Sequence, residues 1–230
     1  MTPKTIEVYC PTLNRPDWAD RFRESVENQI MGWDLKVVLS LDVQSMPRSL
    51  ISLVNGEFLL ARERADVVFV MADHLVLAND CLATAVVKLF EAFPDGDGMV
   101  GLNIENTNRR KDDVSEFCFY GLGTPFLERF KTQGYQALCP DYYHFFAETE
   151  LGLYAKNQRR FVYAEGAKVK SFHPNHGEVP KDGTHKESRK YHAQEARIWD
   201  RRRSQGWLWG KDWNREWPQG WESVPRPSRA

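Results

Sequence analysis

Polar side chains follow three apolar stretches of this 230-residue chain, at the points where each stretch is expected to end as a strand. Thr12 and Arg15 follow the first stretch, Asp42 the second, and Asp73 and His74 the third. A carboxylate and an imidazole at the end of a buried strand can hold a divalent metal ion, and that ion can clamp a diphosphate. Polar residues also end strands for no functional reason, so this chemistry requires that the fold bring the three groups together.

The elements that must position these groups predict an α/β fold. Alternating or continuous apolar runs predict strands, and apolar residues at helical spacing predict helices between them. The expected strands are residues 5–10, 35–41, 66–71 and 99–104, and the expected helices are 17–29, 49–64 and 79–93. We expect the first strand to stop at Pro11 and Asp17 to cap the helix that follows.

This alternation of strands and helices predicts a mostly parallel central sheet covered by helices. In such sheets, ligands bind beyond the carboxyl ends of the strands. The three polar groups therefore fall where a ligand is expected.

Two segments resemble family 2 glycosyltransferases. In residues 66–77, a hydrophobic strand ends in Ala72, Asp73 and His74, which is similar to the acidic "DxD" region of that family. Residues 7–16 resemble the family's first strand and nucleotide loop. The resemblance extends over about residues 5–175 and implies the nucleotide-sugar transferase fold called GT-A.

The resemblance also implies a donor site. Pro11, Thr12, Arg15, Asp42 and Asp73 would bind a nucleotide-diphosphate sugar. Asp73 and His74 would hold a divalent ion, Mn²⁺ or Mg²⁺. Ala72 stands where the family has its first acidic residue and His74 stands at the third position, where imidazole is a competent ligand for manganese-like ions.

A third segment, residues 141–156, resembles the "ED-x-(D/E)-L" segment that opens a helix beneath the family's acceptor site. The resemblance makes Glu148 the catalytic base, with Ala147 in place of its acidic neighbour. An inverting transfer needs a carboxylate that takes the proton of the acceptor hydroxyl, and a helix N-terminus stabilises a carboxylate. Both Glu148 and Glu150 could instead only cap the helix, and Glu150 fits that structural role better.

Residues 161–173 resemble the family's closing strand, whose terminal histidine completes the metal site. This makes His173 a third metal ligand, although a turn through Pro174 and Asn175 could bring His176 there instead. A second Asp-x-Asp pattern, Asp95 and Asp97, sits in a glycine-rich turn and is explained by turn chemistry.

Composition places the chain among globular proteins, with 42% hydrophobic and 27% charged residues. No apolar run approaches the ~20 residues that cross a membrane, and the N-terminus lacks the apolar segment of a signal peptide. The four cysteines are scattered without metal-ligand spacing, which indicates reduced thiols. We expect a cytoplasmic protein, in the host cytoplasm if it is phage-encoded.

Charge and tryptophan are distributed unevenly. Residues 1–167 carry a net charge of −7 and residues 168–230 a net charge of +6, and six of the eight tryptophans lie between Trp199 and Trp221. We therefore divide the chain into a GT-A-like catalytic domain, residues 1–178, and a basic, Trp-rich extension packed on it, residues 179–230.

The extension is expected to begin with a charged helix over residues 186–205, with Tyr191, Ile198 and Trp199 facing inward. The basic residues Arg201–Arg203 and the tryptophans that follow could bind nucleic acid by phosphate pairing and base stacking. The simpler alternative is a tail that wraps the domain and buries its indoles.

The sequence thus predicts a metal-assisted, inverting glycosyltransferase, transferring a hexose or pentose to an acceptor hydroxyl. Compact transferases of this type resemble phage-encoded proteins, and a modified base in phage DNA is the first choice of acceptor, ahead of a saccharide or a protein. Two alternatives remain open: a non-catalytic nucleotide-sugar or saccharide-binding protein of the same fold, and a nucleotidyltransferase.

Overall fold

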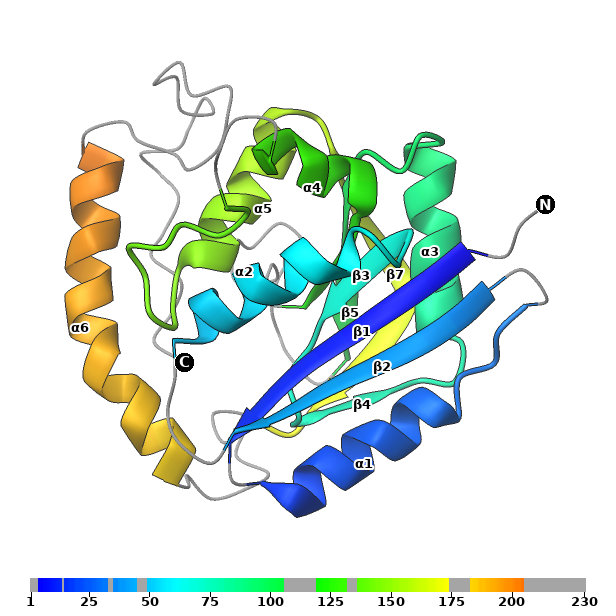
Figure 1. The fold of residues 1–230 in the computed structure, drawn as a ribbon, viewed down its shortest axis with the longest axis horizontal. Helices are drawn as coiled ribbons and strands as arrows, with labels where there is room; N and C mark the ends of the chain where they lie inside the picture. Colours follow the sequence, from blue (N-terminus) through cyan, green and yellow to red (C-terminus); the bar gives the residue numbers. More distant parts are fainter. Residues whose placement is uncertain are drawn as a thin grey trace.

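A computed structural model of the chain describes residues 4–13, 15–32, 35–44, 49–105, 119–131, 136–173 and 183–204. Strands and helices alternate through most of its length (Figure 1). The strands are β1 (Lys4–Leu13), β2 (Leu35–Gln44), β3 (Val67–Val70), β4 (Leu75–Leu77), β5 (Met99–Ile104), β6 (Tyr120–Gly123) and β7 (Phe161–Ser171). The helices are α1 (Pro16–Glu27), α2 (Leu50–Ala61), α3 (Cys81–Ala92), α4 (Thr124–Lys131), α5 (Ala147–Asn157) and α6 (Gly183–Ser204).

The strands form one sheet in the order β2-β1-β3-β6-β5-β7-β4. β1, β2, β3, β5 and β7 share one direction, in agreement with the predicted mostly parallel sheet. β6 and β4 run the opposite way, so neighbouring pairs are a mixture of parallel and antiparallel. The carboxyl ends of the five codirectional strands consequently lie along the same edge as the amino ends of β4 and β6.

Helices cover both faces of the sheet and enclose two apolar cores (Figure 1). α1 and α3 pack on one face through Phe22, Leu82 and Leu89, all fully buried. α2, α4, α5 and α6 contribute to the core of the other face, where Trp199 is 1% exposed. Burial on both faces explains why β3, β5 and β6 are almost entirely apolar or glycine.

The first strand does not stop at Pro11, as the sequence had suggested, but continues to Leu13. The carbonyl of Tyr9 accepts a hydrogen bond from the amide of Met71, so residues 9 and 11 direct their backbone groups toward β3. The pairing between β1 and β3 ends at Tyr9 and Val70, two residues before Pro11. Proline is tolerated in β1 because the amide it lacks would face no strand at that position.

The beginning of α1 also differs in detail from the prediction. Arg15 is the residue that precedes the helix, Pro16 is the first helical residue, and Asp17 lies in the first turn without forming a side-chain cap. Proline suits the first helical position because its φ angle is already helical and no amide is needed there. At the start of α2 the expected type of cap is present, since Ser49 accepts a hydrogen bond from the amide of Ser52 at 3.2 Å.

The helix expected in the C-terminal extension is present as α6. Tyr191 stacks on Tyr143 with ring centroids 4.0 Å apart, Ile198 packs against the core, and Trp199 is buried, as expected for its inner side. The proposed domain boundary at residues 178–179 and the tryptophans from Trp207 onward lie outside the described residues. No helix in the described part of the chain is long and apolar enough to cross a membrane.

Candidate functional site

Asp73 lies in the turn between β3 and β4 and is 4% exposed. Its Oδ2 accepts a hydrogen bond from Thr12 Oγ1 at 2.5 Å, and its Oδ1 lies 3.1 Å from Arg15 Nη1. The three residues come from the end of β1, the start of α1 and the end of β3. The fold therefore joins two of the three polar groups that the sequence marked at strand ends.

Two further residues of α1 extend this cluster, and sequence reasoning did not identify them. Trp18 lies between two guanidinium groups, with Arg15 Cζ 5.2 Å and Arg21 Cζ 5.1 Å from its ring centroid. Arg21 also lies 4.3 Å from the ring centroid of Phe172, just beyond β7. The three-residue spacing of Arg15, Trp18 and Arg21 places them on one helix face, and this spacing is the signal that could have revealed them. The Asp73 cluster thus holds two cations against one carboxylate.

His74 and His173 meet beside Asp73. Their ring centroids are 5.1 Å apart, and His74 Nδ1 lies 3.8 Å from Asp73 Oδ1. The chain after β7 is held there because the amide of Phe172 donates to the carbonyl of His74 at 2.8 Å. Phe119, immediately before β6, also contacts His74, edge-on, with ring centroids 5.8 Å apart.

The predicted metal ligands therefore converge, but they do not form a ligand set as they lie. Among the residues that the structure describes, no three His, Cys, Asp or Glu side chains are grouped closely enough to hold a metal ion. Both oxygens of Asp73 already accept hydrogen bonds, one of them from Arg15. One carboxylate and two imidazoles are a suitable donor set for a manganese-like ion. For Asp73 to coordinate an ion through Oδ1, the Arg15–Asp73 ion pair would have to open.

Asp42 occupies a different position from the Asp73 cluster. It pairs in register with Pro11, but its carboxylate accepts hydrogen bonds from Tyr9 Oη, at 3.1 Å, and from Gln44. Burial and the nearby Asp42 carboxylate raise the pKa of Tyr9 well above its usual value. Tyr9 faces the core beneath α2, whereas Thr12, at the opposite phase of the strand, faces Asp73. Asp42 and Thr12 therefore flank the end of β1 from its two faces.

Glu148 and Glu150, both in the first turn of α5, have different environments. Burial raises the pKa of Glu148 from 4.5 to about 7. The negative charge of Glu195 adds to this rise, and a backbone hydrogen bond opposes it. Glu150 is fully buried and accepts hydrogen bonds from Tyr142 Oη at 2.9 Å and from Arg202 Nε and Nη2 at 2.7 and 3.0 Å. Glu150 thus has a structural role, but that role is an ion pair with α6, where the sequence suggested a helix cap.

This pairing removes Arg202 from the basic residues that could contact nucleic acid, one of the two alternatives for the C-terminal extension. Arg202 is 4% exposed and its guanidinium is used by Glu150, so it cannot reach a phosphate backbone. Arg201 remains exposed. The sequence could not separate these neighbours because the partner of Arg202 lies 52 residues away along the chain.

Asp95 and Asp97 form a structural turn, as expected. Asp95 Oδ1 accepts a hydrogen bond from the amide of Asp97 at 3.0 Å. Arg129 binds the carboxylate of Asp97 through Nε and Nη2 at 2.6 and 2.5 Å. These contacts fasten the turn to α4.

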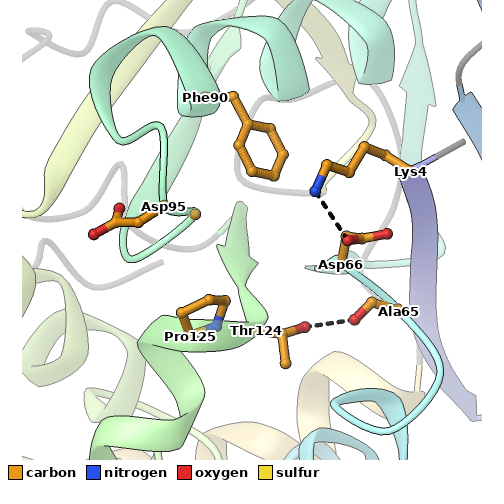
Figure 2. A pocket seen from close by; sticks show the side chains of 8 residues that line it. Lys4, Ala65, Asp66, Phe90, Asp95, Thr124 and Pro125 are labelled. Carbon is orange, nitrogen blue, oxygen red and sulfur yellow. Dashed lines mark hydrogen bonds and ion pairs between the residues drawn. The ribbon is translucent and has the colours of Figure 1, made fainter. Parts of the chain in front are cut away.

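A hollow of about 220 Å³ lies at the amino ends of β1 and β3, at the opposite edge of the sheet from Asp73 (Figure 2). Lys4 Nζ lies 3.1 Å from Asp66 Oδ1, and Thr124 Oγ1 donates to the carbonyl of Ala65 at 2.6 Å. Figure 2 shows these pairs together with Phe90, over which Lys4 also lies, at 4.7 Å from the ring centroid. Lys4 with Asp66, and Thr124 with Ala65, are the two pairs that bind each other here, and none of the candidate site residues lines the hollow.

The arrangement of strands and helices is that of a GT-A-type nucleotide-sugar transferase fold, and solved structures with that fold match it. A mannosyltransferase from Pyrobaculum calidifontis, PcManGT, solved with GDP-Man and Mn²⁺, matches 84% of this chain with a TM-score of 0.57 and 16% identity. A fragment of S. aureus TarS solved with UDP-GlcNAc matches 79% of it with a TM-score of 0.57 and 12% identity. The third is a mutant Drosophila β-1,4-galactosyltransferase 7 with manganese, UDP-Gal and xylobiose, which matches 80% with a TM-score of 0.54 and 14% identity.

These likenesses are of fold. The chain spans 60% of the matched mannosyltransferase chain, 60% of the TarS fragment and 79% of the galactosyltransferase chain. No family of known sequences and no curated protein sequence matches the chain.

Proposed function

We propose that this chain is a glycosyltransferase that moves a sugar from a nucleotide-diphosphate sugar to an acceptor hydroxyl. The observation that carries the proposal is the convergence of Thr12, Arg15 and Asp73 at the carboxyl edge of a GT-A-type sheet. The matched structures contain GDP-Man, UDP-GlcNAc or UDP-Gal, which supports a donor of the same class. The sugar transferred is a hexose or a pentose, and the panel of nucleotide sugars described below distinguishes the two.

The donor would bind at the ends of β1 and β3. Arg15 and Arg21, whose guanidinium groups both lie near the Trp18 ring, supply positive charge for a diphosphate. Thr12, Pro11 and Asp42 stand on the two faces of the adjoining strand end and would contact the nucleoside.

A divalent ion, Mn²⁺ or Mg²⁺, would be held by Asp73, His74 and His173 after Arg15 turns from Asp73 to the donor phosphates. Two of the matched structures contain manganese, which supports this assignment. When bound, the ion would offset the charge that develops on the leaving diphosphate.

Glu148 would act as the general base of an inverting transfer. In its carboxylate form it takes the proton of the acceptor hydroxyl, whose oxygen forms a bond to the anomeric carbon. The bond between that carbon and the diphosphate breaks at the same time, and the nucleoside diphosphate leaves. The pKa of about 7 supports this role, since a general base is most effective when its pKa lies near the working pH.

The acceptor proposal remains a modified base in DNA, and its support is the charge of +6 over residues 168–230. Reading a base in duplex DNA would require flipping it or reaching its substituent through the major groove.

The test is a panel of labelled UDP-, GDP- and dTDP-sugars, incubated with the chain, Mn²⁺, and either modified DNA or oligosaccharides. The expected result is saturable binding of one donor by calorimetry and release of a nucleoside diphosphate on transfer. Release of a sugar phosphate in place of a nucleoside diphosphate would indicate a nucleotidyltransferase instead, because the nucleoside monophosphate would then be the group transferred. Donor binding without transfer or hydrolysis would indicate the non-catalytic binding protein, and transfer to oligosaccharides alone would eliminate the DNA acceptor.

A further inference from the structure

The last described helix, α6, contacts the entry to α5 through a buried carboxylate. This carboxylate belongs to Glu195, which is 2% exposed. Glu195 lies fifty residues after Phe145, one of the residues it contacts there. Its carboxylate accepts hydrogen bonds from the amide of His144, at 3.2 and 3.0 Å, and from the amide of Phe145, at 2.6 Å. A carboxylate suits this position because it offers only acceptors, and consecutive backbone amides offer only donors.

The residue that follows these amides has a conformation that needs external support. Phe146 has a φ angle of 70°, in the left-handed region that non-glycine residues rarely adopt, and α5 begins directly after it. Its ring is buried and stacks on Trp199 of α6, with centroids 5.5 Å apart and an interplanar angle of 28°. Strained backbone of this kind persists only where surrounding contacts fix it.

Two residues beyond Glu148, α6 makes a third contact. The guanidinium of Arg202 binds both oxygens of Glu150. Glu148 therefore stands between two sets of contacts from the same helix, those of Glu195 and Trp199 before it and that of Arg202 after it.

We propose that Glu195 is a positioning residue for Glu148: by binding the amides of His144 and Phe145, it fixes the left-handed turn at Phe146 and with it the direction of the Glu148 side chain. This inference rests on the proposed function, in which Glu148 is the general base. It makes α6 a contributor to the proposed active site through the contacts that fix the start of α5.

The negative charge of Glu195 has a second effect on Glu148. Burial is the main cause of the raised pKa of Glu148, the backbone amide of its own helix start opposes it, and Glu195 of α6 adds to it. In this proposal the same carboxylate fixes the turn before Glu148 and adds to the basicity that burial gives Glu148, and the two effects can be separated by substitution.

The experiment compares Glu195→Ala and Glu195→Gln with the control Gln194→Ala, which changes the exposed neighbour on α6. Glu195→Ala removes every acceptor, so we expect kcat to fall at least tenfold while the KM for the donor stays within about twofold of the parent. Glu195→Gln keeps one acceptor and loses the charge. It should recover most of kcat and shift the midpoint of the Glu148 titration to lower pH. The control should match the parent in all measurements.

Two readouts need no substrate and keep this inference apart from the proposed function. Amide hydrogen exchange at residues 144–146 should accelerate in Glu195→Ala, and an NMR titration of the Glu148 carboxyl should show the lower midpoint in Glu195→Gln. Unchanged exchange and an unchanged midpoint in folded variants would overturn the positioning role, as would a full kcat in Glu195→Ala. The parent chain could also transfer no sugar while Glu195→Ala shows the faster exchange and Glu195→Gln the lower midpoint. That result would contradict the proposed function and leave the positioning role standing.

Discussion

Asp73 is the residue on which the donor end of the proposed site depends, because it binds Thr12 and Arg15 and lies beside His74. Asp73→Asn keeps the shape and the hydrogen bond from Thr12 but removes the charge. We expect turnover to fall by about 10²–10³-fold, the range for losing one preorganised electrostatic contact, and Mn²⁺-dependent nucleotide affinity to weaken. Asp17→Asn, an exposed change in α1, serves as the control. Unchanged Mn²⁺-dependent affinity by calorimetry would show that Asp73 is not a metal ligand.

Glu148 and Glu150 allow a matched test of chemistry against structure. Glu148→Gln cannot accept a proton, so the rate constant should fall by about 10²–10⁴-fold with donor affinity little changed. Glu150→Gln should reduce the rate much less and act mainly on stability, since Glu150 is committed to Arg202 and Tyr142. Equal rate losses in steady-state assays of the two folded variants would mean that the base has been assigned to the wrong residue.

The raised pKa of Glu148 also predicts a pH dependence. Below about pH 7 the carboxyl holds its proton and cannot act as a base, so kcat/KM should rise with pH through about 7. The sign for stability is opposite. The pKa of Glu148 is about 7 in the folded chain and 4.5 as an ordinary value, so the folded chain binds this proton more tightly than the unfolded chain does. The stability that this proton contributes is therefore fully present below pH 4.5 and is lost as the pH rises to about 7. The measurement is a pH–rate profile of the parent chain and of Glu148→Gln. If the residual activity of Glu148→Gln still rises with pH through about 7, the rise belongs to another group.

At the scale of elements, α5 and α6 are joined by the buried ion pair between Glu150 and Arg202. Arg202→Met leaves Glu150 buried without its cation, which should lower the free energy of unfolding by about 3–5 kcal/mol. The double variant Glu150→Gln with Arg202→Met removes the uncompensated charge and should recover part of the loss. Urea unfolding measures both, with Arg201→Met as the exposed control. A loss below about 0.5 kcal/mol for Arg202→Met would show that the pair does not stabilise the interface.

The elements that sequence could predict are those whose burial pattern is long enough to read. β5 matches its expected range of 99–104, and α2 and α3 lie within theirs, because each repeats a pattern over six to twelve residues. β4 has three residues and β6 has four, which is too few for a periodicity. β6 also contains Gly121, where a Cβ atom would lie 2.6 Å from the Phe69 ring. The packing of β6 at this position requires glycine, and an apolar sequence pattern does not reveal such a requirement.

The site shows the same limit. Thr12, Arg15 and Asp73 could be identified because each follows a predicted strand, and parallel strands bring their ends together. Glu195 and Arg202 could not, because each acts on a partner about fifty residues earlier and neither has a local pattern that distinguishes it from the other charged residues of α6.

At the scale of the whole molecule, the prediction concerns the tail. Removing residues 207–230 deletes five tryptophans but leaves α6 and every candidate site residue in place. If the tail binds a nucleic-acid acceptor, the truncated chain should lose DNA affinity and much of its salt dependence, while slow donor hydrolysis continues. If the tail instead completes the core, the truncated chain should melt early, since each buried aromatic is worth ~1.5–3 kcal/mol. Thermal unfolding and DNA binding at two salt concentrations distinguish the outcomes, and a stable truncation with full DNA binding would remove the support for a DNA acceptor.

The contacts of α6 also set an order in time. Every strand of the described sheet and the helices α1 to α5 are encoded before residue 183, so they leave the ribosome before the helix that supplies Glu195, Trp199 and Arg202. A nascent chain can therefore complete its sheet while the turn at Phe146 still lacks the partners that fix it. If Glu195 positions the proposed base, that base acquires its final orientation only when α6 docks, after the strands and the helices α1 to α5 have been synthesised.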